Sequence, residues 1–381
     1  SEMCIRDSVY PVPRGVSYNS YLLLDEKTAL FDTIDQAFTH QLLENVSSVL
    51  DGRSLDYLIV NHMEPDHCAS IADILFRYPG VKIVCTAKAA NMMKQFFEFD
   101  VDQYVVPVKE GDTLSLGVHT LTFVMAPMVH WPEVMVTYET TEKILFSADA
   151  FGSFGAIDGN IFADETDYKN QWLPEARRYY CNIVGKYGAQ VQALLKKAAG
   201  LDIAMICPLH GPVLKENLGY YIGLYDTWSK YEPETEGVVV AYASIHGNTA
   251  AAARRMAESL SEKGAAEVML IDLCRDDMAL AVETAFHYSK MIVAASSYDA
   301  GVFPPMFDFL HHLQIKNFQK RRVGIIENGS WAPTAGRMMS CMLSEMKNME
   351  IMEHMVTIKS SMKKADLLQM EELAEELLAT E

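Results

Sequence analysis

The chain has 381 residues, of which 50% are hydrophobic and 22% are charged, so it is long enough for two folded domains with substantial cores. Its formal net charge of −19 excludes a nucleic-acid-binding surface, because such a surface needs clustered lysines and arginines. No apolar run approaches the roughly 20 residues of a membrane helix, and no signal-peptide pattern opens the chain, so we expect a soluble, cytoplasmic protein without a membrane partner.

The first half of the chain mixes apolar runs with helical segments and longer loops. Residues 1–8 show no periodicity and predict no element, and the first strand is expected at Ser20–Leu24. Further strands are predicted at Tyr57–Val60, Val81–Cys85, Leu121–Met125, Ile144–Phe146 and Asp202–Ile206. Strands interleaved with helices in this way indicate mixed α/β layers.

A polar, proline-containing stretch from Ser229 to Gly237 reads as a linker, which predicts one domain at 1–232 and another at 237–381. Beyond it, strands are predicted at Val238–Ala243, Glu267–Leu273, Lys290–Ala295, Arg322–Ile326 and Met352–Ile358. Helices are predicted from Thr249, near Met278–Phe286, Pro305–Leu313 and Ala335–Met346, and from Lys364. Five strand–helix units indicate a doubly wound, five-stranded parallel sheet.

The seven cysteines are scattered along the chain, and no Cys-x-x-Cys pair occurs. This spacing excludes a zinc ribbon or a rubredoxin module within the chain. We expect reduced thiols that behave as small apolar side chains.

Four potential metal ligands occur within six residues directly after the predicted strand that ends at Val60. They are His62, Glu64, Asp66 and His67. Helical spacing would not bring all four together, and Pro65 opposes a helix in the middle of the run, so we expect a turn that folds around an ion.

Three further candidates also follow predicted strands, namely His130, Asp149 and His210. Because strand C-terminal ends converge on one rim in layered α/β folds, four loops can bring seven ligands into one pocket. Seven ligands exceed the four of a structural zinc site and suit two metals that share a bridging carboxylate, for which Asp149 is the natural candidate.

The ligand pattern resembles the metallo-β-lactamase signature His-x-His-x-Asp-His, with Glu64 in place of the second histidine. A carboxylate at this position shifts the preference from zinc towards iron or manganese. This variant, followed by a flavodoxin-like half, resembles the flavodiiron proteins. The resemblance extends from about Gly15 over nearly the whole chain and includes Trp131-Pro132-Glu133 and Asp149-Ala150-Phe151-Gly152. One departure is Ser153-Phe154, where many relatives have Gln-His, and it leaves substrate preference open.

The resemblance implies a metallo-β-lactamase-like αββα sandwich followed by a flavodoxin-like sheet. It implies one iron on His62, Glu64 and His130, a second on Asp66, His67 and His210, and Asp149 between them, with no catalytic side chain beyond these ligands. The implied activity is reduction of O₂ to water, of NO to N₂O, or of both, with electrons that pass through FMN. It also implies a head-to-tail homodimer or homotetramer and an external donor such as a rubredoxin.

Three loops at predicted strand ends are candidates to hold this FMN. They are rich in Gly, Ser, Thr and Asn, so backbone N–H groups and a helix N-terminus can surround a phosphate there. The candidate residues are Ser244, Ile245, His246, Gly247, Asn248, Thr249, Ser296, Ser297, Tyr298, Asp299, Ala300, Gly301, Asn328, Gly329, Ser330 and Trp331. Trp331 is either a flavin-stacking side chain or a core tryptophan. No Gly-x-Gly-x-x-Gly fingerprint occurs, which disfavours Rossmann-type NAD or FAD binding.

Two other functions fit parts of the sequence. The main alternative is a zinc-dependent hydrolase of the metallo-β-lactamase type with an accessory flavodoxin-like domain. Glu64 argues against this function, because zinc sites of this type have a histidine at that position. The second is a flavodoxin-like electron carrier with a vestigial first domain, against which the complete ligand set argues. The choice between O₂ and NO stays open.

Overall fold

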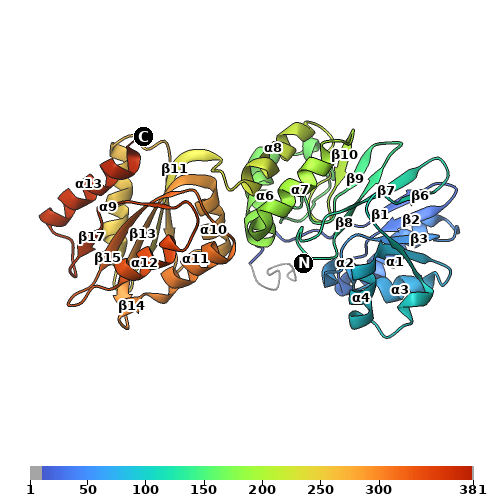
Figure 1. Ribbon diagram of the computed structural model, residues 1–381, viewed down its shortest axis with the longest axis horizontal. Helices are drawn as coiled ribbons and strands as arrows, with labels where there is room; N and C mark the ends of the chain where they lie inside the picture. The colour runs from blue at the N-terminus through green and yellow to red at the C-terminus, as the bar shows by residue number, and fades with distance from the viewer. Residues whose placement is uncertain (1–10, 380–381) are drawn as a thin grey trace. The chain divides into compact units, whose positions relative to one another are not determined.

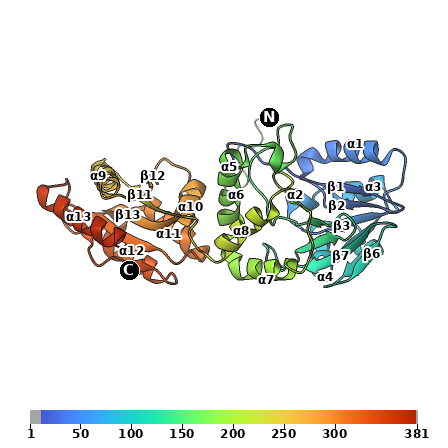
Figure 2. The same cartoon turned by 90° about the horizontal axis from the view of Figure 1, so that it is seen from above.

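The structure is a computed structural model that describes residues 11–379, so the irregular stretch at residues 1–8 lies outside the described residues. The described chain divides into two compact units (Figures 1 and 2). The first contains residues 11–180 and Ala189–Asp226, and the second contains Cys181–Gly188 and residues 227–379. The stretch expected as a linker, Ser229–Gly237, therefore groups with the second unit. No helix in the described residues is long and apolar enough to span a membrane.

Two five-stranded sheets pack face to face in the first unit. The first sheet has the order β1 (Tyr21–Leu24), β2 (Thr28–Phe31), β3 (Tyr57–Val60), β4 (Lys82–Thr86), β5 (Val105–Val108), and it is parallel apart from the β1–β2 pair. The second sheet has the order β10 (Met205–Cys207), β9 (Ile144–Phe146), β8 (Met135–Glu139), β7 (Thr120–Met125), β6 (Thr113–Ser115). Phe31 of the first sheet stacks on Phe146 of the second at 3.7 Å between ring centroids, within an apolar layer that both sheets share.

Helices cover the outer faces of this sandwich. The helices α1 (Thr39–Leu50), α3 (Ile71–Arg77) and α4 (Ala87–Phe96) bury apolar side chains against the first sheet (Figure 1). Four more helices gather at one end of the unit (Figure 2), and they are α5 (Tyr168–Gln171), α6 (Leu173–Tyr179), α7 (Gly188–Ala198) and α8 (Leu218–Ser229). The Lys197 ammonium of α7 donates to the backbone carbonyl of Met125 in β7, at 2.7 Å.

The second unit is a doubly wound parallel sheet. Its strand order is β12 (Val268–Asp272), β11 (Thr235–Ala243), β13 (Tyr288–Tyr298), β15 (Arg322–Asn328), followed by β16 (Glu350–Ile351) and β17 (Val356–Ile358), with the short β14 (Gly301–Val302) antiparallel to β13. The helices are α9 (Asn248–Glu262), α10 (Met278–His287), α11 (Pro304–Ile315), α12 (Ala335–Ser344) and α13 (Lys364–Leu378). Helices α9 and α13 share one face of this sheet (Figure 1).

Of the fifth predicted strand, Met352–Ile358, only Val356–Ile358 is a strand in the structure (β17), and the short β16 (Glu350–Ile351) precedes the predicted range. Between them the backbone N–H groups of Glu353 and His354 donate to the Glu376 carboxylate of α13, at 2.7 and 3.1 Å. These donors are therefore lost from the sheet ladder, and the expectation of one continuous strand was wrong. Glu376 lies 22 positions after His354 in the sequence, so the local pattern could not show this contact.

Arg321, the residue directly before β15, is a buried cation that holds three chain segments together. Its guanidinium donates to the carbonyls of Tyr288, Tyr231 and Phe286 at 2.6–2.8 Å. Burial lowers the pKa of this guanidinium to about 10. Because Arg321→Met would leave three buried carbonyls without these donors, we expect the second unit to lose about 2–4 kcal/mol of stability in chemical denaturation. The exposed Arg337→Met is the matched control, and equal losses in the two variants would contradict this role.

Candidate metal centre and flavin cavity

The dense ligand run begins in the loop after β3 and ends in a one-turn helix, α2 (Pro65–Cys68). The expectation that Pro65 opposes a helix here was wrong, because Pro65 occupies the first helical position of α2. A proline is accepted there, since the missing N–H has no partner inside the helix. The carbonyl of Glu64 accepts from His67 N at 2.9 Å and so closes the turn. Asp66 and His67 therefore project from a helix, whereas His62 and Glu64 project from the loop.

The structure brings the seven expected side chains together in two groups. The first group is His62, Glu64, His130 and Asp149, and the second is Asp66, His67 and His210. Within each group the ligand atoms lie within 4.8 Å of one another. His130 comes from the loop after β7, and Asp149 and His210 follow β9 and β10, as the strand-end argument predicts.

Asp149 faces both groups, one carboxylate oxygen to each. Its Oδ2 lies 3.0 Å from His130 Nε2 and 3.3 Å from His62 Nε2. Its Oδ1 lies 3.2 Å from His67 Nε2 and 3.7 Å from His210 Nε2. The side chain is 1% exposed. This is the arrangement that a carboxylate needs in order to bridge two cations.

The donor set fits two cations on physical grounds. Asp149 Oδ1 and Asp66 Oδ1 are buried oxygens without a hydrogen-bond partner in the described structure, and His67 Nε2 and His210 Nε2 face each other at 3.0 Å. Burial lowers the pKa of His130 and His210, but hydrogen bonds to Asp149 and Asp66 respectively raise it to about 9 in each case. Protons therefore balance the carboxylates in this cluster, and divalent cations would replace them.

Two groups behind the ligands set the direction of the imidazoles. The buried Glu133 accepts from His62 Nδ1 at 2.8 Å and from the backbone N–H of Met63 at 2.9 Å. The carbonyl of Ser17 accepts from His210 Nδ1 at 2.9 Å. In both histidines Nδ1 carries the proton and Nε2 is left to face a cation. Sequence reasoning noted the motif that contains Glu133 but assigned it no role.

Replacing Glu133 by Gln should weaken metal binding, because an amide orients the His62 ring less strongly than a carboxylate and does not increase its basicity. We expect about tenfold to a hundredfold lower metal affinity, measured as the metal retained per chain after competition with a chelator. The exposed Glu142→Gln is the matched control. Metal retention equal to that of the unmodified protein would show that Glu133 does not support the site.

A buried aromatic wall stands behind His210. The ring of Tyr179, at the end of α6, lies 5.4 Å from the His210 ring and packs edge-on against Phe154 at 5.1 Å. Ser153 fills the space beside Gly211, where an added Cβ would lie 2.8 Å from the Ser153 Cβ. The departure at Ser153-Phe154 therefore acts on the metal centre through packing around His210.

The hydroxyl of Tyr179 is a buried group that sequence reasoning missed. The side chain is 2% exposed, and its oxygen has no hydrogen-bond partner in the described structure. Burial raises the pKa of Tyr179 well above its usual value, and the negative charges of Asp149 and Glu64 raise it further, so the group stays protonated as a donor. Nothing in the local pattern marks this tyrosine, because it occupies an ordinary buried position in a helix.

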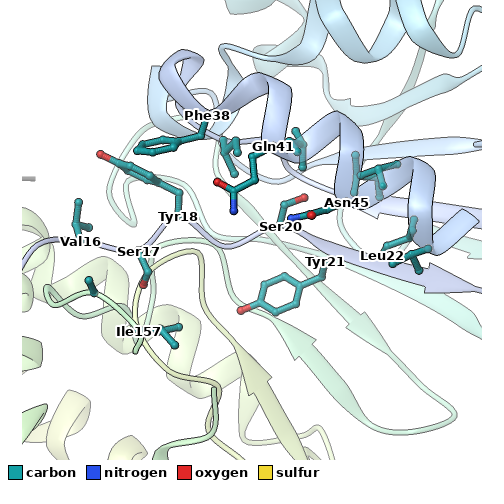
Figure 3. A pocket seen from close by; sticks show the side chains of 16 residues that line it. Val16, Ser17, Tyr18, Ser20, Tyr21, Leu22, Phe38, Gln41, Asn45 and Ile157 are labelled. Atoms are coloured by element: carbon teal, nitrogen blue, oxygen red, sulfur yellow. The ribbon is translucent and has the colours of Figure 1, made fainter. Parts of the chain in front are cut away.

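A cavity of about 650 Å³ lies in the first unit, between α1 and the segment that leads into β1 (Figure 3). Gln41 of α1 points towards Ser20 there, and Tyr18 lies beside Phe38 at one end. None of the seven candidate ligands lines this cavity. Tyr18 also contacts the His210 ring at 5.7 Å, so this single segment separates the cavity from the metal centre.

A second cavity, of about 470 Å³, lies at the C-terminal ends of the strands in the second unit. Of the sixteen residues expected to hold FMN, all but Gly247 and Gly301 line it. Ala332 and Thr334, which continue the candidate loop after β15, line it as well, and so does Ser360, which was not expected. Ser360 follows β17, so the same strand-end rule, applied to the last predicted strand, could have found it.

The walls of this cavity fit a flavin phosphate. Gly247, with φ of 89°, turns the chain into α9, and its N–H donates to Ser244 Oγ at 3.1 Å. The hydroxyls of Thr249 and Ser296 lie 2.9 Å apart at the same end of the cavity. Neutral hydroxyls and a helix N-terminus can hold a phosphate without a basic side chain. Trp331 is 92% exposed at the rim, so the alternative of a core tryptophan was wrong.

Comparison with known proteins places both units in one family. Residues 16–211 match the family described as ODP family beta lactamase. The chain is 30% identical to the anaerobic nitric oxide reductase flavorubredoxin of Salmonella typhi, over 88% of this chain and 70% of that protein. The chain belongs to the flavodiiron protein family. It is also 32% identical to the flavorubredoxin of Aliivibrio fischeri, over 84% of this chain but only 65% of that protein.

Solved flavodiiron structures confirm the expected fold class. The rubredoxin oxygen:oxidoreductase from Desulfovibrio gigas matches with a TM-score of 0.90 and 28% identity, over 97% of this chain and 92% of that chain. The flavodiiron protein from Giardia intestinalis matches with a TM-score of 0.91, over 99% of this chain and 93% of that chain. Because its sequence identity is 24%, this match supports the fold alone. Membership of this family implies a flavin and a diiron site, and it does not favour the zinc-hydrolase alternative.

Proposed function

We propose that this flavodiiron protein is a cytoplasmic oxidoreductase that reduces NO, O₂ or both at a diiron site, with electrons from FMN. One iron would be held by His62, Glu64 and His130, the other by Asp66, His67 and His210, with Asp149 bridging them. The observation that carries this proposal is the position of Asp149, whose two oxygens each face one ligand group. Glu64 supports iron over zinc, because it adds an oxygen ligand where the zinc signature has an imidazole.

The flavin would occupy the cavity of the second unit, held by the loops that follow β11, β13, β15 and β17. FMN suits this cavity better than a dinucleotide, because one phosphate cradle is present and no Gly-x-Gly-x-x-Gly turn follows a strand. Trp331 and Tyr298, two exposed residues that line this cavity, would cover the isoalloxazine ring.

The bound flavin and irons supply the electrons, four for O₂ to water or two for each pair of NO molecules converted to N₂O and water. The contribution of the protein is to bind these cofactors and to orient the metal ligands. Glu133 and the Ser17 carbonyl fix two imidazoles, and the walls around Phe154 and Tyr179 exclude water on one side. The Tyr179 hydroxyl would offer a hydrogen bond to a molecule bound at the metal centre, because no group within residues 11–379 accepts it.

The partners in this proposal follow from the family. Relatives carry the names flavorubredoxin and rubredoxin oxygen:oxidoreductase, which supports a rubredoxin-like one-electron donor. A head-to-tail homodimer or homotetramer would place the flavin of one chain beside the irons of another, and it remains part of the proposal.

Metal and cofactor analysis of the purified protein tests this function. We expect about two irons and one FMN per chain, and consumption of NO under anaerobic conditions, of O₂, or of both when a reduced donor is supplied. Comparison of the two rates with the same donor identifies the preferred substrate. Two zinc ions and no flavin would contradict the proposal.

A further inference from the structure

A group of buried tyrosines begins at the metal centre of the first unit. The ring of Tyr179 lies 5.4 Å from the ring of His210, a candidate ligand. A Cβ added at Gly152 would lie 2.9 Å from the Asp149 carbonyl oxygen and 3.1 Å from Tyr179 Cε1, so the tyrosine ring packs on the loop that carries Asp149. Tyr179 therefore contacts both a candidate ligand and the loop of the proposed bridging carboxylate.

Tyr225 of α8 contacts the same loop. Its hydroxyl accepts from the backbone N–H of Phe151 at 2.6 Å, and its ring stacks on the Phe151 ring at 4.3 Å between centroids. The ring of Tyr180, the residue after Tyr179, lies 5.0 Å from the Tyr225 ring. Aromatic rings at such separations are in contact. Tyr180 therefore links Tyr179 to Tyr225 through one peptide bond and one ring contact.

Tyr221 of α8 continues this group towards the surface. It lies four positions before Tyr225, and residues at that spacing are neighbours on one face of a helix. The ring of Tyr221 lies 4.8 Å from the ring of Tyr168 in α5, and Tyr168 is half-buried. The other four tyrosines are at most 7% exposed, and all five belong to the first unit. We define the tyrosine chain as Tyr179, Tyr180, Tyr225, Tyr221 and Tyr168.

Packing alone does not require a hydroxyl group at each of these positions. Phenylalanine would supply the same ring, and burial of a phenol hydroxyl costs free energy that a hydrogen bond must offset. The chemical difference is that a phenol gives up one electron and one proton to a strong oxidant, whereas the phenylalanine ring does not. Reduction of O₂ to water takes four electrons, so a metal centre that holds fewer is left oxidising. The tyrosine chain begins beside that centre.

We propose that the tyrosine chain carries oxidising equivalents from the metal centre to a thiol at the surface when the flavin does not supply enough electrons. This inference rests on the proposed function. Tyr179 gives one electron to the metal centre and releases its phenol proton there, and each tyrosyl radical then takes one electron and one proton from the next tyrosine. The radical on Tyr168 takes a hydrogen atom from the thiol.

Two such transfers produce two thiyl radicals, which combine to one disulfide. In the net reaction two thiols lose two electrons and two protons, and the metal centre receives both electrons. The protons released at the metal centre are used when O₂ is reduced to water. The side chains around the metal ligands are thereby spared oxidation, which would otherwise damage the site from within.

Tyr221→Phe tests the tyrosine chain, because it keeps the ring and removes the oxidisable phenol in the middle. Iron- and flavin-loaded protein is reduced with a limiting amount of dithionite and mixed with O₂ or, in a second arm, with hydrogen peroxide. We expect a tyrosyl radical in freeze-quench electron paramagnetic resonance and oxidised Tyr168 in peptide mass spectrometry. Added glutathione should shorten the lifetime of this radical. In Tyr221→Phe, oxidation of Tyr168 should be lost and oxidation of Tyr180 and Tyr225 should increase.

Tyr138→Phe is the matched control. Tyr138 belongs to the same unit and is 7% exposed, as Tyr221 is, but its ring contacts no other aromatic side chain among residues 11–379. Its replacement removes one buried phenol outside the tyrosine chain. The radical signal and the oxidation of Tyr168 should be those of the unmodified protein.

Equal oxidation of Tyr168 in Tyr221→Phe and the unmodified protein would overturn the proposal, as would the absence of tyrosine oxidation with both oxidants. Circular dichroism identifies a variant that has failed to fold, and Tyr168→Phe, which removes the last phenol, then serves in its place. With excess donor, gas consumption by Tyr221→Phe should equal that of the unmodified protein, because the flavin then supplies the electrons. Absence of gas consumption from every protein would refute the proposed function, whereas the peroxide arm would still decide whether the tyrosines transfer oxidising equivalents.

Discussion

Asp149→Asn is expected to lower NO and O₂ consumption by more than about a hundredfold while the flavin stays bound. Asp149 is the one side chain whose two oxygens face both ligand groups, at 3.0 Å from His130 Nε2 and 3.2 Å from His67 Nε2. The asparagine amide has one oxygen and one NH₂, and the NH₂ cannot act as a ligand. One of the two ligand groups therefore loses the oxygen that Asp149 supplies to it. The measurement is donor-driven gas consumption together with iron and flavin content per chain.

The matched control for this variant is Asp158→Asn, an exposed position further along the same loop. It should leave both activities and the iron content unchanged. Flavin content should be normal in both variants, because the flavin cavity is lined entirely by residues of the second unit. Turnover by Asp149→Asn at the rate of the unmodified protein would refute the bridging role.

Tyr179→Phe should lower turnover about tenfold to a hundredfold while iron and flavin content stay the same. The phenylalanine keeps the ring contacts to Phe154 and His210 and removes only the buried hydroxyl. Because that hydroxyl has no partner in the described structure, its removal should leave thermal stability unchanged or slightly higher. A fall in stability would instead assign the hydroxyl a structural role.

Tyr138→Phe is the control for the loss of a tyrosine hydroxyl. Its oxygen donates to the carbonyl of Asp202 at 2.8 Å, so removal should cost some stability and no activity. The two variants are therefore expected to show opposite effects. Equal turnover in Tyr179→Phe and the unmodified protein would show that the hydroxyl does not act on the substrate.

Local patterns were sufficient where an element depends on its own residues. Strand β3 has the predicted bounds, Tyr57–Val60, and helix α10 begins at the predicted Met278. Pro65 shows where this reasoning failed. Proline was taken as a helix breaker, but at the first helical position it removes no hydrogen bond. The error left the expected position of Asp66 and His67 unchanged, because they remain at the end of the same strand.

The sequence by itself determined the seven candidate ligands, the loops that line the flavin cavity and the fold class. It could do so because parallel strands end on a common rim, so residues that follow separate strands meet there. Only the tertiary structure decided which groups act on those residues. Glu133 and His62 are 71 positions apart, and Ser17 and His210 are 193 apart. Such contacts depend on how whole layers pack. The Tyr179 hydroxyl, which has no partner among residues 11–379, depends on packing in the same way, because burial and the absence of a partner are properties of the folded chain and of no local pattern.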